Sequence, residues 1–360
     1  MEVTSVKRIH QSDWTDSGVR FLRARDIVAE SKKENVSEPL FISQEKYDEY
    51  SAVSGKVKKG DLLVTGVGTI GVPMLINSEE PLYFKDGNII WFKNENVIDG
   101  RFFYYSFNGL NIQKFIKESA GLGTVGTYTI ENGKKTPINL PPKKDEQAKI
   151  GEYFFNLDHL ITLHQRKYDK LTKAKKSMLE KMFPKNGTNV PEIRFKGFTD
   201  AWEQRKLVEL VDVCSGRDYK HLSEGTIPVY GTGGYMLSVN DALSYDRDAI
   251  GIGRKGTIDR PYILKAPFWT VDTLFYAVPR EKVDLNFAFD IFQNIDWKKK
   301  DESTGVPSLS KTAINDIDVL APKHGEQQTI GQFFAAIDHL ITLHQRKFFI
   351  YKSDTNLHFN

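Results

Sequence analysis

The sequence predicts an α+β protein in which two β-rich globular domains alternate with two long helices that pair as an antiparallel coiled coil. Three observations predict this architecture: a length of 360 residues, an internal repeat, and a heptad pattern within the repeat. The ten residues DHLITLHQRK at Asp158–Lys167 return unchanged at Asp338–Lys347, 180 residues later. A unit of that length is far larger than a solenoid repeat, so each copy must contain a domain of its own.

The domains are expected where strand-like segments lie between turn residues. These segments are 62–67, 89–93 and 101–105 in the first half, and 248–253, 268–278 and 314–322 in the second. The two domains should be related but divergent, because Gly68-Thr69-Ile70 resembles Gly256-Thr257-Ile258. We expect a first domain over 1–141, a helix over 142–183, a linker over 184–200, a second domain over 201–321, a second helix over 322–352 and a tail over 353–360.

Apolar residues at alternating steps of four and three predict the helices, because this spacing forms the seam of a coiled coil. A helix with an apolar seam needs a partner, and its own duplicate is available. The pattern stops after Tyr351, where the polar KSDTNLHFN follows, so a shortened second helix is expected. The predicted seam residues are Ile150, Phe154, Leu157, Ile161, His164, Tyr168, Leu171, Ile330, Phe334, Ile337, Ile341 and His344.

The composition is that of a soluble globular protein, with 40% hydrophobic and 27% charged residues. No apolar run approaches the roughly 18 residues of a membrane span, and a cytoplasmic location is expected. The lone Cys214 excludes an internal disulfide and a clustered-thiolate zinc site. The net charge of +3 is too small to require a nucleic-acid partner.

Motifs of catalysis and of metal binding are absent from the sequence. Gly251–Gly256 fits G-x-G-x-x-G, but Pro261 and β-branched residues follow it and oppose the helix that a dinucleotide site requires. No P-loop occurs. His159 and His164 recur with the helix, which explains them without a metal. We expect a non-catalytic chain with no metal site.

Two divergent domains alternating with two similar heptad helices resemble the specificity (S) subunit of type I restriction-modification systems. The similarity covers nearly the whole chain. PEIRFKGFTDAWEQRKLVEL from Pro191 and IPVYGTGG from Ile227 resemble one target-recognition domain of that family; SVKRIHQ from Ser5, RARDIV from Arg23 and GDLLVTGVGTIGVPMLI from Gly60 resemble another. By that pattern, the chain is expected to be truncated at its N-terminus and in the second conserved helix.

The resemblance implies reading of double-stranded DNA, with no catalysis by this chain. Each target-recognition domain would contact half of a bipartite sequence, and the helix pair would set the gap between the halves. Two modification (methyltransferase) subunits and restriction (translocase and nuclease) subunits would be the partners. S-adenosylmethionine, ATP and magnesium are expected on those partners and not on this chain.

Basic residues in loops are the candidates for DNA contact, because Arg and Lys bind base edges and phosphates. A solvated surface charge is the alternative for each, and Arg25 next to Asp26 also fits an ion pair. The candidates are Lys7, Arg8, His10, Arg23 and Arg25 in the first domain, and Arg217, Lys220, Arg254, Lys255 and Arg260 in the second. Gly231–Gly234 would allow close backbone approach to DNA, or form a simple turn.

Two other functions remain open at this point. One is a truncated or silent allele that assembles with partner subunits but does not specify DNA. The other is a coiled-coil adaptor with no role on DNA, because such helices pair generically.

Overall fold

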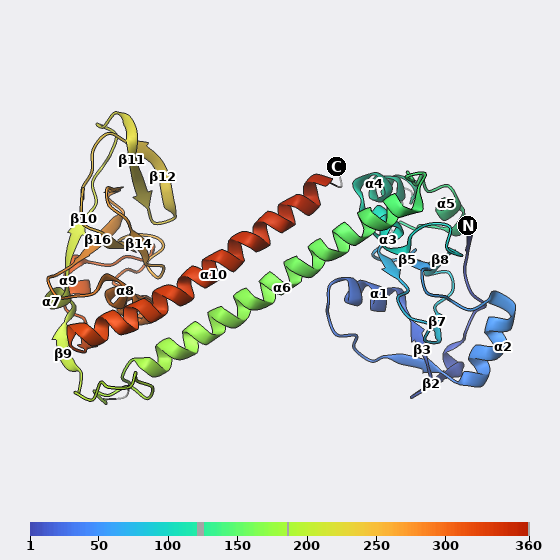
Figure 1. Ribbon diagram of the computed structural model, residues 1–360, viewed down its shortest axis with the longest axis horizontal. Helices are drawn as coiled ribbons and strands as arrows, with labels where there is room; N and C mark the ends of the chain where they lie inside the picture. Colours follow the sequence, from blue (N-terminus) through green and yellow to red (C-terminus); the bar gives the residue numbers. More distant parts are fainter. Residues whose placement is uncertain (121–125, 186, 359–360) are drawn as a thin grey trace. The chain divides into compact units, whose positions relative to one another are not determined.

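The computed structural model describes residues 1–120, 126–185 and 187–358, with side chains described as far as residue 354. The chain divides into two compact units. Unit 1 contains Met1–His164 together with the chain from Lys347 onward, and unit 2 contains Gln165–Arg346. Each unit therefore holds one β-rich domain and a part of both long helices (Figure 1). No helix in the described residues is long and apolar enough to cross a membrane.

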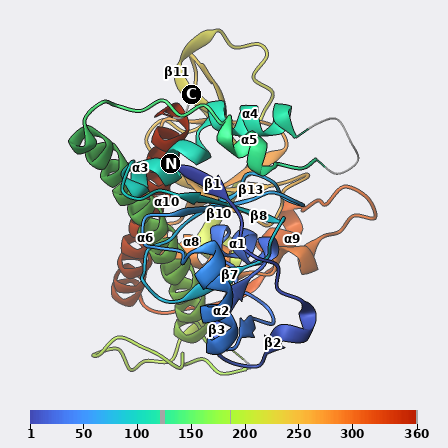
Figure 2. The same cartoon turned by 90° about the vertical axis from the view of Figure 1, so that its right-hand side faces the viewer.

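The first domain has two four-stranded sheets. One has the order β1 (Glu2–Thr4), β8 (Ile89–Lys93), β5 (Leu62–Thr65) and β6 (Pro73–Leu75), all antiparallel. Figure 2 labels its paired strands β1 and β8. The other has the order β2 (Trp14–Thr15), β4 (Leu40–Ile42), β3 (Val19–Leu22) and β7 (Leu82–Phe84). The helical elements are η1 (Gln11–Asp13), α1 (Ala24–Ser31), α2 (Gln44–Ser54), α3 (Gly100–Asn108), α4 (Leu110–Ser119) and α5 (Ile130–Lys134).

The second domain repeats this plan. Its main sheet has the order β10 (Val211–Ser215), β16 (Leu274–Pro279), β13 (Ala249–Gly253) and β14 (Tyr262–Leu264). A second sheet has the order β12 (Gly234–Val239), β11 (Glu224–Gly231) and β15 (Trp269–Thr270), and a third pairs β17 (Asp318–Ala321) with β9 (Glu203–Lys206). The helical elements are α7 (Leu207–Leu210), α8 (Leu285–Asn294), η2 (Trp297–Lys300) and α9 (Lys311–Asn315).

The two domains are related in topology, as the sequence predicted. Their main sheets share one strand order in which every pair is antiparallel, and β3 pairs with β7 in parallel just as β11 pairs with β15. The similar tripeptides at Gly68 and Gly256 lie in equivalent loops, between β5 and β6 and between β13 and β14. Both glycines have positive φ, +78° and +88°, a conformation that glycine adopts most readily.

The repeated segments are long helices, α6 (Lys144–Met182) and α10 (His324–His358). In unit 2 they run antiparallel: Lys175 contacts Asp338, and Phe183, the residue after α6, contacts Phe334, which is earlier in α10. In unit 1 the His164 ring lies 5.5 Å from that of Tyr351. All predicted seam residues are buried or half-buried. The predicted antiparallel pairing is confirmed.

Each helix holds its own domain through the same few repeated residues. The side chain of Gln147 accepts a hydrogen bond from the backbone N of Asp99 (3.0 Å), and that of Gln327 accepts one from Asp284 (3.2 Å). One turn further along α6, Gly151 lies against the start of α3, as Gly331 lies against the start of α8. Part of the repeat therefore serves domain docking and not helix pairing.

The linker expected over 184–200 is anchored to α10. The guanidinium of Arg194 binds both carboxylate oxygens of Glu326 at 2.7 Å, and the indole N–H of Trp202 also donates to Glu326 (3.4 Å). Glu326 is 3% exposed, so this pair is buried at the start of the helix.

The prediction of a strand over 101–105 is wrong, because these residues lie in α3. Asp99 caps this helix by accepting a hydrogen bond from the backbone N of Phe102 (2.9 Å). Phe103 and Phe107, four residues apart, are both fully buried beneath the main sheet. Aromatic residues favour strands only weakly, and helical packing against the sheet outweighs that preference here.

The prediction that the second helix ends at residue 352 is also wrong, because α10 continues to His358. The residues after Tyr351 contain neither glycine nor proline, and extending a helix costs much less than starting one. Two strands are shorter than expected: 268–278 divides into β15 and β16, and only Asp318–Ala321 of 314–322 is a strand. Ser310 caps α9 just before that strand.

Candidate nucleic-acid interface

Two loops of the second domain lie at one end of its main sheet. The last residues of β10 and β13, Ser215 and Gly253, lie beside Phe275 and Leu274 at the beginning of β16. The β10–β11 loop and the β13–β14 loop therefore leave the sheet at the same edge. All five basic candidates of this domain lie in these two loops, so residues more than 40 positions apart share one surface, which we call the strand-end surface.

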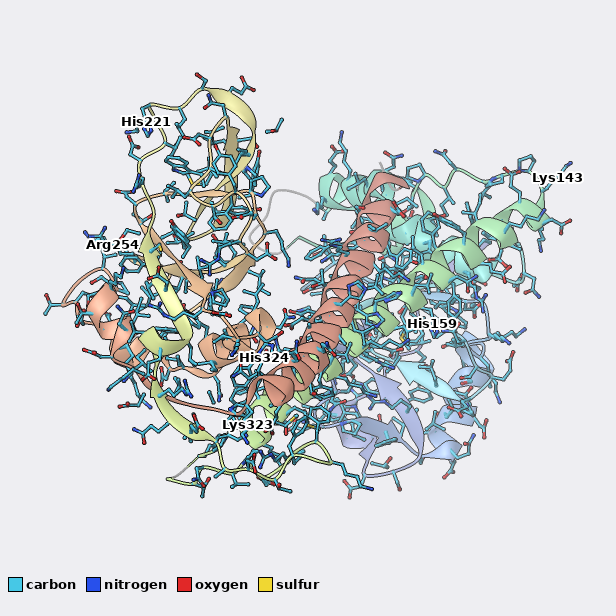
Figure 3. All side chains as sticks on the ribbon, turned by 60° about the vertical axis from the view of Figure 1, so that its left-hand side comes forward. Lys143, His159, His221, Arg254, Lys323 and His324 are labelled. Atoms are coloured by element: carbon cyan, nitrogen blue, oxygen red, sulfur yellow. The ribbon has the colours of Figure 1, made fainter. Side chains whose placement is uncertain are left out.

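Arg217 and Lys220 occupy the β10–β11 loop. The backbone of Arg217 is fixed from both sides: its N donates to the carbonyl of Thr270 (2.9 Å), and its carbonyl accepts from the indole N–H of Trp269 (2.9 Å). Both basic side chains are exposed, and within the described residues neither forms an ion pair. The loop therefore holds two solvent-facing cations on a fixed backbone. His221 lies nearby, on the side of the β11–β12 hairpin (Figure 3).

Arg254 and Lys255 begin the β13–β14 loop, and backbone contacts hold both. Their backbone N atoms donate to the carbonyl of Thr273, at 2.8 and 3.3 Å, and Leu309 donates to the carbonyl of Arg254 (2.9 Å). The Arg254 guanidinium lies 5.7 Å from the ring of Phe275, and its Nη1 makes a long contact of 3.4 Å with the carbonyl of Asp272. Because the side chains take little part in holding the loop, both remain exposed and available to a ligand.

Arg260 closes the same loop and is exposed. The structure adds three residues that sequence reasoning missed, Lys298, Lys299 and Lys300 of η2. Lys298 reaches the loop through a 2.9 Å ion pair with Asp259, which lowers the pKa of that carboxyl group. Their signal in the sequence is the run WKKK, which a search for loop arginines passes over.

The equivalent end of the first domain carries Lys7, Arg8 and His10. These residues follow β1 as Arg217 and Lys220 follow β10, and all three are exposed. The Lys7 ammonium lies 4.0 Å from the centre of the Tyr50 ring, and the Arg8 guanidinium donates to Asp86 at 2.8 Å. The bond to Asp86 raises the pKa of Arg8.

The other two candidates of the first domain serve the fold. Arg23 donates to both oxygens of Asp26 at 3.0 Å and to the carbonyl of Glu38 at 2.8 Å. The Arg23 side chain is only 17% exposed, so we remove it from the candidates for DNA contact. Arg25 is more exposed, at 55%, and lies between Asp26 (3.8 Å) and Glu38 (3.6 Å), which matches the ion pair that its sequence neighbours allowed.

The β5–β6 loop of the first domain differs from its counterpart in charge. It reads GVGTIGV from Gly66 and has no basic residue where the second domain has Arg254 and Lys255. A Cβ atom added at Gly66 would lie 2.7 Å from the carbonyl oxygen of Tyr128, so the backbone there is closely packed. The two domains thus present different chemistry at equivalent positions.

The glycine motif, the cysteine and the histidines singled out in the sequence can now be placed in the fold. Gly251–Gly253 lies within β13, and a loop, not a helix, follows it. Within the described residues, no group of three or more His, Cys, Asp or Glu side chains is arranged to hold a metal ion. Burial raises the pKa of the Cys214 thiol, which makes it a poor nucleophile. The Gly231–Gly234 segment is the turn of the β11–β12 hairpin (Figure 1).

Comparisons with known proteins place this geometry in a family. The model of the type I restriction modification DNA specificity domain matches twice, over residues 25–173 and 199–348. The chain is 24% identical over 298 residues to the MjaVIII type I restriction enzyme specificity subunit of Methanocaldococcus jannaschii, covering 71% of this chain and 67% of that protein. It is 33% identical over 126 residues to the type I restriction enzyme specificity subunit named S.HindORF215P in Haemophilus influenzae, over 34% of this chain and only 31% of that protein.

The fold comparison agrees with the family match. The crystal structure of the type I restriction-modification S subunit from M. genitalium superposes with a TM-score of 0.68 at 15% identity, covering 99% of this chain and 92% of that one. At that identity the likeness shows the fold, while the two matches to the domain model show the family. This chain therefore belongs to the type I restriction-modification DNA specificity family.

Proposed function

We propose that this protein is the specificity subunit of a type I restriction-modification complex and that it recognises a bipartite DNA sequence. The single observation that carries the proposal is the duplicated domain whose loops bring basic residues to the same end of equivalent sheets. The β13–β14 loop carries Arg254 and Lys255, whereas the equivalent β5–β6 loop has no basic residue. This difference supports an asymmetric target, because each domain would read its own half-site.

Partner subunits would carry out the chemistry. In this proposal two modification subunits and the restriction subunits assemble with this chain in the cytoplasm and bind S-adenosylmethionine, ATP and magnesium. The chain itself would contribute affinity and base recognition. Arginine and lysine side chains at the strand-end surface would contact phosphates and base edges, and phosphate contacts make binding dependent on salt.

The test is an electrophoretic mobility shift with the chain alone and with its modification subunits. Reversal of charge in Arg254→Glu with Lys255→Glu should weaken DNA binding by about tenfold or more, and the affinity should depend less steeply on salt. The backbone bonds of both residues persist, so the fold should be retained. Lys282→Glu is the matched control, because this exposed lysine follows β16 at the opposite end of the same sheet.

Two results would count against the proposal. Unchanged affinity in the Arg254 and Lys255 double variant would remove the strand-end surface from the interface. Absence of sequence-specific binding in the full complex would favour an allele that assembles without specifying DNA, or a coiled-coil adaptor.

A further inference from the structure

A lysine lies at a seam position between the two long helices of unit 2. Lys175 of α6 is 8% exposed. Its ammonium donates to both carboxylate oxygens of Asp338 in α10, at 2.6 Å each, and to the side-chain oxygen of Gln293 in α8 at 2.5 Å. One cation thus joins α6 and α10 to the helix of the second domain.

A second carboxyl group lies close to the same ammonium. Asp290 of α8 is 1% exposed, and its Oδ2 has no hydrogen-bond partner among the described residues. Burial raises the pKa of Asp290 well above its ordinary value; Asp338 and Asp284 raise it further, and Lys175 lowers it. Removal of the lysine would take away the ion-pair partner of Asp338 and the positive charge that lowers the pKa of Asp290.

Unit 1 differs at the equivalent aspartate. Asp158 is the repeat equivalent of Asp338, and it accepts a hydrogen bond of 2.8 Å from the hydroxyl group of Tyr105 in α3. Since α3 and α8 begin at equivalent capping residues, Asp99 and Asp284, Tyr105 and Asp290 occupy the same position in the two domains. The first domain brings a phenol to the repeated aspartate, whereas the second brings a carboxyl group.

The repeat also shows which helix can supply the cation. The residue 180 positions after Lys175 is Thr355, so α10 has threonine where α6 has lysine. Four of the seven seam positions before Lys175 are identical in the two helices, and the other three hold apolar or aromatic residues in both, namely Leu157 and Ile337, Tyr168 and Phe348, and Leu171 and Tyr351. Apolar packing alone therefore gives α10 little reason to prefer α6 over a second copy of α10.

We propose that Lys175 selects α6 as the mate of α10 beside the second domain, and that the requirement arises because Asp290 replaces the tyrosine found in the first domain. A polar residue at one seam position is known to determine which helices pair and in what register, at some cost in stability. A second copy of α10 in the place of α6 would present threonine to Asp338, which would then lose its ion-pair partner while lying beside the buried Asp290.

The structure also contains the space for a compensating change. An open pocket of about 340 Å³ lies between α8 and α10, lined by Asp290, Asp338, Phe289 and Ile341 among others. A tyrosine at position 290 would extend into this space and could donate to Asp338, as Tyr105 donates to Asp158. The phenol should then make the lysine dispensable.

Four variants of the full chain test the proposal by calorimetric unfolding: Lys175→Met, Asp290→Tyr, the two combined, and Lys176→Met as an exposed control on the same helix. Lys175→Met alone should lower the Tm by about 5 °C or more, and Lys176→Met by less than about 2 °C. In the Asp290→Tyr background, Lys175→Met should change the Tm by less than about 2 °C. An equal loss in both backgrounds would overturn the proposal, as would failure of the combined variant to fold.

The choice of α6 as the pairing partner of α10 can be tested separately, by measuring the dimer fraction. Lys175→Thr makes the two helices alike at this position, so light scattering should show a dimer fraction that rises with concentration and exceeds that of the wild type at least severalfold. If the variant and the wild type have the same mass at every concentration, Lys175 does not select the mate.

Discussion

Gly151 offers a sharp test of how each domain is held on its helix. An added Cβ atom at Gly151 would lie 2.6 Å from the backbone N of Phe102 and 2.9 Å from the side-chain oxygen of Asp99. Both distances are too short for carbon, and one of the atoms belongs to the backbone. Gly151→Ala must therefore push the start of α3 away from α6.

The magnitude follows from three contributions. Overpacking against the backbone costs about 1–3 kcal/mol. Displacement of Asp99 from the backbone N of Phe102 loses a helix cap, which costs about 1 kcal/mol. Alanine in place of glycine within α6 gains about 1 kcal/mol. We expect Gly151→Ala to lower the free energy of unfolding by about 1–3 kcal/mol.

Denaturant unfolding of the full chain, followed by circular dichroism, measures this change. Gly325→Ala is the control, because an added Cβ atom at Gly325 in the first turn of α10 meets nothing within 4 Å. This control should be neutral or stabilising by up to about 1 kcal/mol. If Gly151→Ala proves as stable as the wild type, the close fit between α6 and α3 does not hold the first domain.

Two further predictions concern buried charges. The pKa of Asp290 is raised in the folded state, so its contribution to stability is complete below the ordinary aspartate pKa of about 3.9 and declines as the pH rises through the raised value. Asp290→Asn should therefore reduce the fall of Tm with rising pH in that window. Parallel curves of Tm against pH for the variant and the wild type would contradict this. Arg194→Met should lower the free energy of unfolding, measured with denaturant, by about 3 kcal/mol, because it leaves Glu326 buried without a cation. Adding Glu326→Gln should recover much of this loss. No recovery would show that the ion pair is not the cause.

The long helices were predictable because their signal is local and repeated. Alternating steps of three and four identify a seam wherever the helix lies, and the duplicate identified its mate. The strands of the main sheets were predictable for a similar reason, as at 89–93, where every residue but the last is buried. The helix at 101–105 was not predictable from its aromatic residues, because its capping by Asp99 and its packing on the sheet decide its state.

The candidate interface was only partly predictable. Sequence reasoning named Arg254 and Arg217 as candidates for DNA contact, but only the strand register shows that they lie at the same end of one sheet. It also selected Arg23, which forms an ion pair with Asp26 three residues later. Whether two charged residues at that spacing bind each other depends on side-chain geometry, which the sequence does not give. The role of Lys175 was hidden for the same reason, since its partners come from two other helices.

The division of the chain into two units has a consequence for synthesis. Unit 1 is completed by residues from Lys347 onward, so Tyr351 covers His164 only after the second domain has been made. Domains generally fold as units while the ribosome is still elongating the chain, N-terminal part first. The newly made first domain must therefore wait with the apolar seam of α6 uncovered, and during that interval a chaperone, or a neighbouring chain on the same messenger RNA, can reach the seam before its mate does.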